Sequence, residues 1–331
     1  MTIREAVIRA IRERQGQWVS GEALSQGLNV SRTTIWKQIK MLQSEGYAIE
    51  SSPKKGYRLS IFPDILSPEE VKGGLQTSAF GQEHYFYFRE IDSTNNYAKQ
   101  LAAEGYAEGT LVVAEKQSAG RGRRGRQWHS EPGQGIFMSL ILRPKLPVKE
   151  LSRITMFIAV AIVETLNGVG IKSGIKWPND VLVNGRKIAG ILTEAVTDMD
   201  GIEYIVTGIG LNVNTLIKDF PEEFRSIATS VQEEAGCVFP RVELLQALLL
   251  HLEKHYQKLI AGGFNEILEK VRNLSLVIGH DIKIDSVNGI SNGRAIDIDN
   301  NGFLMVRDAM GNIHHVMSGE ILFKPNKKTV K

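Results

Sequence analysis

Cysteine is almost missing from this chain of 331 residues: Cys237 stands alone. One cysteine cannot form a disulfide within the chain, and no CxxC or Cys/His spacing offers a zinc site. The sequence therefore predicts no metal site built from its own side chains. It also predicts a reducing, cytoplasmic location.

The chain also lacks a long apolar run and a leader. No stretch approaches the roughly 18 apolar residues that a membrane helix needs. Residues 1–16 read MTIREAVIRAIRERQG, where charges are spread throughout instead of preceding an apolar segment. We therefore expect no signal peptide, no membrane-spanning helix and no membrane partner.

The formal net charge is small, +3, but the charged residues are unevenly distributed along the chain. Residues 1–60 hold ten Lys/Arg and five Asp/Glu, whereas the rest of the chain holds 30 and 32. A basic first segment on a near-neutral body favours contact with a polyanion. A solvated surface would look the same, so charge alone leaves both readings open.

The first sixty residues follow a helix-turn-helix pattern. Thr2 and Glu5 form a capping box, and Ser20 caps a second short helix. A tight turn at 27–30 leads to a third helix, which Ser31 caps and Gly46 ends, with Ile35, Ile39 and Leu42 inward. Two strands, 47–50 and 57–59, follow as a hairpin, or wing, around the turn 53–56.

The third helix and the hairpin carry the polar residues expected to meet DNA. Short hydroxyls and long cations at a helix start suit base edges and phosphates in the major groove. A helical bundle used only for packing or dimerisation is the alternative. The candidate DNA-binding residues are Ser31, Arg32, Thr33, Thr34, Trp36, Lys37, Lys40, Lys54 and Lys55.

After a linker at 63–68, strands and helices mix. Ser67 and Pro68 predict the capped start of a helix. Strands are expected at 85–88, 111–114, 136–142 and 202–209, and helices at 151–169 and 241–260. From Gly279, short strands (281–284, 294–298, 303–306, 314–317 and 321–323) alternate with turns at 288–289, 292–293, 301–302 and 310–311, the pattern of a small barrel.

These patterns predict an α+β protein of three domains. The expected bounds are 1–62 for a winged helix-turn-helix domain, 66–272 for a mixed-sheet domain and 275–331 for a small β-barrel. The segment 219–236 is polar and is expected to be irregular. His314 and His315 face opposite sides of a strand, so they predict a structural pair and no metal site.

Two polar segments of the middle domain are candidates for ligand binding. Asp92–Asn96 follows a strand and opens a helix, where free N–H groups bind polar atoms, although ordinary capping explains the same residues. Gly120–Arg126, the arginine loop, packs four arginines and three glycines between two apolar strands. Such runs are more often nucleic-acid or targeting segments, but here we expect an anion clamp. It does not match the P-loop pattern.

Two further motifs lie downstream. Lys176–Asp180 (KWPND) is followed by Asn184-Gly185, a strong hairpin signal that places Lys187 at a strand start. A lone lysine there is usually solvated, but its Asn-Asp neighbours favour an anion contact. Gly208–Asn214 (GIGLNVN) ends an apolar strand, either as a bulge or as backbone that lies close to a ligand.

At these residues the chain resembles the bifunctional biotin–protein ligases that also repress the biotin operon. GRGRRGRQW, KWPND, Arg186–Ile191 and GIGLNVN occur in the family's order and approximate spacing, and the resemblance covers the whole chain. It implies a class II synthetase-like catalytic domain and an SH3-like C-terminal domain. It also implies biotin and ATP as substrates, with Mg²⁺ on the phosphates.

The resemblance also implies partners and roles. The partners are a biotin carboxyl carrier domain, operator DNA and, once biotinyl-AMP is bound, a second copy of the chain. Lys187, Arg123 and Asp180 are the expected catalytic residues. Biotin binding is expected at Ser93, Thr94, Asn95, Gln117, Arg121, Gly122, Arg123 and Lys187, and nucleotide binding at Arg121, Arg124, Trp128, Asn179 and Asn212. Two alternatives stay open: a transcription factor that senses a biotin-like ligand without catalysis, and a lipoate-transferring relative.

Overall fold

The computed structural model describes residues 3–14, 16–44, 46–61, 64–197, 201–286 and 289–322. The chain divides into two compact units, Met1–Gly73 and Gly74–Lys331. Each unit is described by itself.

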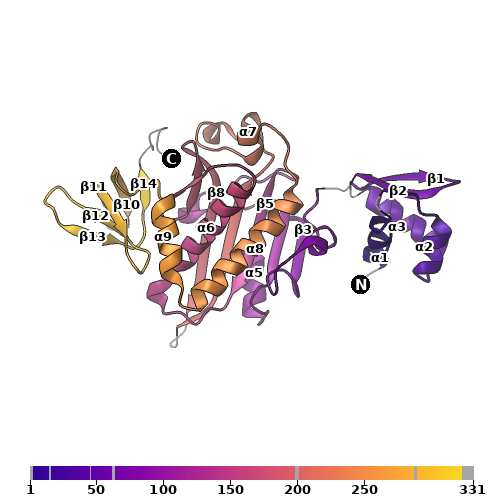
Figure 1. The fold of residues 1–331 in the computed structure, drawn as a ribbon, viewed down its shortest axis with the longest axis horizontal. Coiled ribbons are helices and arrows are strands. Elements are labelled where there is room, and N and C mark those ends of the chain that lie inside the picture. The colour runs from indigo at the N-terminus through magenta and orange to yellow at the C-terminus, as the bar shows by residue number, and fades with distance from the viewer. Residues whose placement is uncertain are drawn as a thin grey trace. The chain divides into compact units, whose positions relative to one another are not determined.

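The first unit contains a helix-turn-helix followed by a hairpin (Figure 1). Its elements are α1 (Ile3–Arg12), α2 (Gly21–Gly27), α3 (Arg32–Ser44), β1 (Ala48–Ser52), β2 (Gly56–Ile61) and α4 (Pro68–Val71). Ser20 Oγ accepts from Ala23 N–H, and Ser31 Oγ accepts from Thr34 N–H, so both predicted caps are confirmed. The proposed Thr2–Glu5 capping box lies outside the described side chains.

The helix α4 belongs to this first unit through two side-chain contacts. Arg4 Nη1 donates to Glu69 Oε1 over 2.6 Å, and Tyr47 Oη donates to the buried Glu70 Oε1 over 3.0 Å. Ser67 occupies the N-cap position, but it makes no capping hydrogen bond, so the predicted side-chain cap is wrong. The contacts from Arg4 of α1 and from Tyr47, just before β1, hold α4 in place without that cap.

The second unit is built on a seven-stranded mixed sheet of order β3-β4-β5-β9-β8-β7-β6. β3 and β4 are parallel, and the other neighbours are antiparallel. The strands are β3 (Tyr85–Ile91), β4 (Leu111–Gln117), β5 (Gly135–Leu142), β6 (Gly174–Lys176), β7 (Asp180–Val183), β8 (Arg186–Thr197) and β9 (Ile202–Asn212). The mixed α/β domain predicted from the sequence is therefore present.

Helices cover both faces of this sheet. The α-helices of this unit are α5 (Thr94–Ala103), α6 (Ser152–Gly168), α7 (Val231–Ala235), α8 (Arg241–Ile260) and α9 (Phe264–Leu274). Asn95 of α5 packs against Gly208, whereas Thr155 of α6 lies 3.1 Å from Thr193. Because alternate strand residues face opposite sides and Leu192 pairs with Gly208, α5 and α6 lie on opposite faces. Figure 1 shows α6 and α8 side by side on their face.

In the part of the chain that the structure describes, one segment, Val148–Gly168, is long and apolar enough to cross a membrane. Eleven residues of α6 are buried, and this helix packs on β8, α8 and α9. Its apolar character is thus explained by the protein core.

A five-stranded antiparallel sheet of order β13-β12-β11-β10-β14 completes the second unit. Its strands are β10 (Asp281–Ser286), β11 (Gly289–Ile298), β12 (Leu304–Arg307), β13 (Ile313–Val316) and β14 (Glu320–Leu322). The turn predicted at 292–293 is wrong, because Asn292 pairs with Lys283 inside β11. Asn288, in the turn predicted at 288–289, lies outside the described residues, as does the chain after Leu322.

Two further segments differ from expectation. The region 219–236 is not wholly irregular, since it contains α7, capped by Ser230 Oγ on Glu233 N–H. The helix α9 was missed, although its buried Phe264, Ile267, Leu268 and Val271 follow helical spacing.

Candidate active site

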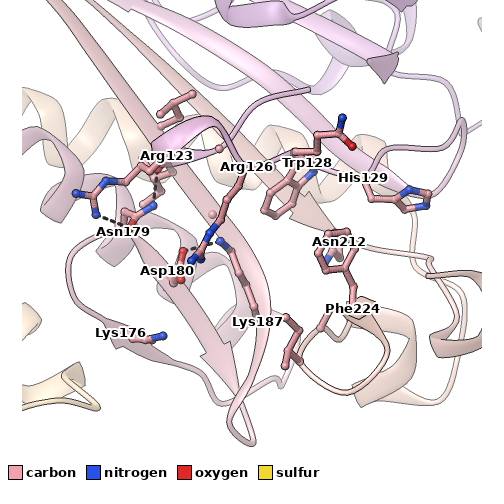
Figure 2. Close-up of a pocket in the computed structure, with 18 of the residues that line it drawn as sticks. Arg123, Arg126, Trp128, His129, Lys176, Asn179, Asp180, Lys187, Asn212 and Phe224 are labelled. Atoms are coloured by element: carbon pink, nitrogen blue, oxygen red, sulfur yellow. Dashed lines mark hydrogen bonds and ion pairs between the residues drawn. The ribbon is translucent and has the colours of Figure 1, made fainter. Parts of the chain in front are cut away.

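A cavity of about 1170 Å³ opens on the face of the large sheet that carries α5, and it is called the central cavity below. It is lined by the Ser93–Asn95 and Gln117 end, the arginine loop, the KWPND segment, the start of β8, the end of β9, residues 220–228 and Gly319–Ile321. All the candidate catalytic, biotin-binding and nucleotide-binding residues line it. Figure 2 labels six of them: Arg123, Trp128, Asn179, Asp180, Lys187 and Asn212. Segments about 200 residues apart in the sequence therefore meet here.

The floor of the central cavity is a row of paired residues across four strands. Lys176 pairs with Asp180, Asp180 with Gly190, and Gly190 with Gly210. Directly paired residues share a face of a sheet. Glycine is needed at 190 and 210, because a Cβ there would lie 2.8 and 2.4 Å from the Trp128 ring. The indole of Trp128 thus packs against two strands at positions that carry no side chain, Gly190 and Gly210.

Beside this row, the start of α5 and the end of β4 carry uncharged polar side chains. Thr94 donates to Gln117 Oε1 from its N–H (2.9 Å) and its Oγ1 (3.1 Å). The buried Asn95 donates from Nδ2 to Glu194 Oε2 over 2.8 Å, and a Cβ at Gly208 would lie 2.3 Å from Asn95 Oδ1. These groups fix one another in place, which suits a site that recognises a neutral polar ring.

A lysine–aspartate pair also lines the cavity. Lys187 Nζ is 2.6 Å from Asp180 Oδ1, and it lies 5.3 Å from the Trp128 ring centroid. The backbone of Lys187 is held on both sides, because its N–H donates to Ile227 O (2.7 Å) and its carbonyl accepts from Thr229 N–H (2.9 Å). Lys187 is thus oriented before any ligand arrives.

The arginine loop is ordered by neutral and acidic partners. Arg123 Nη1 donates to Asn179 Oδ1 (3.1 Å) and to Gly319 O (3.3 Å). Arg124 contacts Asp285 of β10 at 2.9 Å, and Arg126 contacts Glu320 of β14 at 2.5 Å. The four like charges of the loop repel one another, and the carboxylates of the C-terminal sheet offset two of them.

Burial lowers the pKa of Arg123 from its ordinary value, and the nearby Asp180 acts in the opposite direction. A guanidinium stays charged in proteins, so Arg123 presents a partly desolvated cation to the cavity. Arg121 turns to the other end, where its Nη2 donates to Asn96 Oδ1. Asn96 in turn donates to Asp92 Oδ2 (2.6 Å), which lowers the pKa of Asp92.

Another wall of the cavity is formed by Trp128, Asn212 and residues of the segment 220–228. Asn212 Nδ2 is already engaged by Thr229 O at 3.0 Å, so its amide braces this wall. Trp128 Nε1 and His129 Nε2 are buried without a partner among the described residues. The aromatic face of Trp128 beside these polar groups suits a planar polar ligand.

Sequence reasoning missed several lining residues. Lys176 begins the KWPND motif and Arg186 begins the segment 186–191, but neither was predicted to bind a ligand. His129 directly follows the GRGRRGRQW motif. Phe220, Phe224, Gly319 and Glu320 carry no local signal, since only tertiary packing brings them to the cavity.

The side chains that line the central cavity do not supply a full set of metal ligands. No group of three or more His, Cys, Asp or Glu side chains with metal-binding spacing occurs in the described ranges. The acidic groups that line the central cavity are Asp180, Glu223 and Glu320, and two of them are in ion pairs. These three carboxylates do not form a metal cage.

The fold and the cavity define a two-part protein: a helix-turn-helix domain ahead of a ligase-type α/β domain. Family models match in three places: the HTH domain at residues 4–58, the biotin/lipoate A/B protein ligase family at 87–212, and the biotin protein ligase C-terminal domain at 277–324. The chain belongs to the family of bifunctional ligase/repressor BirA proteins.

Similar proteins span nearly the whole chain. The bifunctional ligase/repressor BirA of Bacillus subtilis is 41% identical over 97% of this chain and 98% of its own length. That of Escherichia coli is 30% identical over 95% of both. Among solved structures, the biotin protein ligase from Aquifex aeolicus in complex with biotin and ATP covers 72% of this chain and 97% of its own, with a TM-score of 0.62 and 29% identity.

Proposed function

We propose that this chain is a biotin–[biotin carboxyl carrier protein] ligase that also acts as a biotin-responsive transcriptional repressor. The observation that carries the catalytic half is the meeting of Arg123, Lys187 and Trp128 over one glycine floor beside a fixed polar cluster. Membership of the BirA family supports both halves.

The first step joins two anions. A biotin carboxylate oxygen attacks the α-phosphorus of ATP, the bond to the bridging oxygen of the β-phosphate breaks, and pyrophosphate leaves with that electron pair. Biotinyl-5′-AMP remains. Lys187 and Arg123 would offset the negative charge that gathers on the α-phosphate. Asp180 would orient Lys187 through the 2.6 Å pair.

The second step transfers biotin. The neutral ε-amine of a carrier-domain lysine attacks the acyl carbon, an amide bond forms, and AMP leaves as the mixed anhydride bond breaks. The incoming amine, with a reference pKa near 10.4, must lose a proton. Asp180 is the candidate acceptor, and its pairing with Lys187 favours the orienting role.

We assign the ligand-binding roles from where each residue lies in the central cavity. Ser93, Thr94, Asn95 and Gln117 would bind the biotin ring, with Arg121–Arg123 and Lys187 toward its carboxylate. Trp128 would form a wall for the adenine, while Asn179, Asn212 and Arg124 would support the nucleotide side. Mg²⁺ would be bound to phosphate oxygens.

The DNA-binding half rests on α3 and the hairpin. Arg32, Thr33, Trp36, Lys37 and Lys40 are exposed, as are Lys54 and Lys55 of the hairpin turn. Ser31 Oγ and Thr34 Oγ1 lie 2.8 Å apart at the helix start. We take α3 as the recognition helix, β1–β2 as a wing, and operator DNA as the partner in the cytoplasm of a bacterium.

The remaining expectations complete the proposal. The expected domains are 1–62, 66–272 and 275–331, but the contacts of α4 favour a first boundary after Gly73. The C-terminal sheet would close as an SH3-like barrel. Binding of biotinyl-AMP would favour a homodimer, the form that represses. Ultracentrifugation with and without biotinyl-AMP tests that last point, and an unchanged sedimentation coefficient would contradict it.

The ligase function is tested by mixing the protein with ATP, biotin and a carrier domain. A biotinylated carrier is expected. If biotin binds but the carrier stays unmodified, the chain is a ligand-sensing transcription factor instead. If lipoate outcompetes biotin as the transferred group, the substrate assignment is wrong.

A further inference from the structure

Glu234, on α7, is a carboxylate that accepts hydrogen bonds from three side chains around the start of β8. Its Oε1 accepts from Arg186 Nη2 over 2.9 Å and from Thr229 Oγ1 over 2.7 Å, and its Oε2 accepts from Asn184 Nδ2 over 2.9 Å. The side chain is 9% exposed. A largely buried carboxylate is stable when it is paired and hydrogen-bonded in this way, and it fixes its donors in one arrangement. The reaction above gives Glu234 no role.

The start of β8 is left by β9 on one side. β8 pairs with β9 only from Ala189 onward, and Val213, just after β9, donates its N–H to Gln134 O over 3.0 Å instead. Residues 227–229 occupy the position beside Lys187, where they form a parallel bridge and two backbone hydrogen bonds with it. A segment held by so few backbone bonds opens easily unless side chains also hold it in place.

The same segment contributes to the central cavity. Phe224 lines the cavity (Figure 2), and so does Ala228. The carbonyl of Thr229 accepts from Asn212 Nδ2 over 3.0 Å, so the position of Thr229 also sets the position of that amide. Glu234 itself is not among the residues that line the cavity. Any effect of Glu234 on a ligand must therefore pass through Thr229 and its neighbours.

We propose that Glu234 is a positioning residue for adenylation, which holds the wall segment 220–228 against Lys187. Through Thr229 it fixes the end of this segment, and through Arg186 it fixes the residue that precedes Lys187. The separation between the Lys187 cation and the wall is thus set before a ligand binds. This inference rests on the proposed adenylation and adds to it a residue that does not touch the substrates.

The test compares Glu234→Gln, Thr229→Val and the double variant, with Glu243→Gln as the matched control. Glu243 is exposed on α8 and does not line the cavity. Hydrogen exchange of the backbone amides at 217–229 is measured without ligand, which reports on the segment independently of activity. The rate of biotinyl-AMP formation is then measured with ATP and biotin varied separately, and thermal unfolding is recorded for each full-length protein.

We expect Glu234→Gln to speed exchange at 227–229 and to raise the KM for ATP about 10-fold to 100-fold, since it weakens hydrogen bonds to a charged group. The KM for biotin should stay as in the wild type, because Asn95 is held by Glu194 instead. Thr229→Val should have a smaller effect in the same direction. The double variant should be no worse than Glu234→Gln alone, because both changes act on one contact. Glu243→Gln should behave as the wild type.

Two kinds of result would overturn the inference. Unchanged exchange at 227–229 in Glu234→Gln, or single effects that simply multiply in the double variant, would show that Glu234 does not act through Thr229. An equal rise in the KM for ATP and for biotin, with a lower unfolding midpoint, would mark a purely structural role. If Glu234→Gln fails to fold, Thr229→Val alone decides by the same readouts. A wild-type protein that makes no biotinyl-AMP would overturn the proposed function itself, while hydrogen exchange would still test how the segment is held.

Discussion

Trp128 and Gly210 are in contact across the floor of the cavity: a Cβ on Gly210 would lie 2.4 Å from Trp128 Cε2. The absence of a side chain at one position therefore sets where the ring at the other position lies. Gly190, paired with Gly210, does the same for the other edge of the indole.

Gly210→Ala is expected to lift Trp128 and weaken nucleotide binding while biotin binding stays intact. Stacking of a base on an aromatic ring contributes about 1–3 kcal/mol, so the KM for ATP should rise about 5-fold to 150-fold. Steady-state kinetics with each substrate varied measure this effect. Gly168→Ala, where a Cβ meets nothing within 4 Å, is the control. A rise in the KM for biotin alone would contradict the role given to Trp128.

Lys187→Met should lower the rate of biotinyl-AMP formation about 100-fold to 1000-fold, because it removes a fixed cation from the reacting phosphate. Asp180→Asn should cost less, about 10-fold to 100-fold, since Lys187 remains but loses its 2.6 Å partner. Single-turnover assays separate the two variants. Equal losses would mean that Asp180 does more than orient Lys187.

The ion pairs that hold the arginine loop should be weak contributors to stability. Arg126 is two-thirds exposed, so its pair with Glu320 is worth about 0.2–1 kcal/mol. We expect Glu320→Gln to leave the thermal unfolding midpoint nearly unchanged and to speed proteolysis within 120–126. Limited proteolysis with and without biotin and ATP measures the second effect. A large loss of global stability would show that Glu320 supports the fold itself.

Acid should destabilise the second unit through His255, which is 2% exposed and lies 2.7 Å from Glu164 Oε2. Burial lowers the pKa of His255, although Glu164 acts against it; Lys270, Lys254 and His251 also face this cluster. The unfolded chain thus takes up a proton near pH 6.5 before the folded one does, so stability falls as pH drops below about 6.5.

Thermal unfolding between pH 7.5 and 5.5 tests this prediction. His255→Gln should flatten the loss of stability in that window, whereas the exposed His314→Gln should not. An unchanged slope in His255→Gln would show that another group titrates.

DNA binding should be separable from ligation. Because Glu69 and Glu70 of α4 contact Arg4 and Tyr47, the clean truncation removes residues 1–73 and not 1–62. The truncated chain should keep ligase activity and lose operator binding. In the full chain, Lys37→Ala should reduce the slope of log K against log salt by about 1. Loss of ligation on truncation would reveal coupling between the two units.

Local signals predicted much of this protein. The Ser20 and Ser31 caps, the Asn184-Gly185 turn and the helix at 241–260 depend on neighbours in the sequence, and the structure confirms them. The arginine loop was singled out because its charges lie between apolar strands, and Lys187 because it follows an Asn-Asp pair at a strand start. The polar cluster at Thr94 was harder to interpret, since capping explains the same composition.

The predictions that proved wrong concern features that depend on packing between segments far apart in the sequence. Ser67 lacks its cap bond although its local pattern is favourable, because α1 and Tyr47 anchor the helix instead. The turn signal at Asn292-Gly293 is overridden by pairing with β10. Glu320 meets Arg126 across 194 residues, a contact that no local pattern indicates.

The central claim is that the cavity makes and holds biotinyl-AMP, and one measurement tests it most directly. Wild-type protein and Arg123→Gly are incubated with biotin and α-labelled ATP without a carrier, passed through a desalting column, and followed for loss of label. The account predicts that the wild type retains labelled biotinyl-AMP and that Arg123→Gly releases it faster, having lost a charge-assisted contact. Absence of labelled biotinyl-AMP in the wild type, or equal release from both proteins, would contradict it.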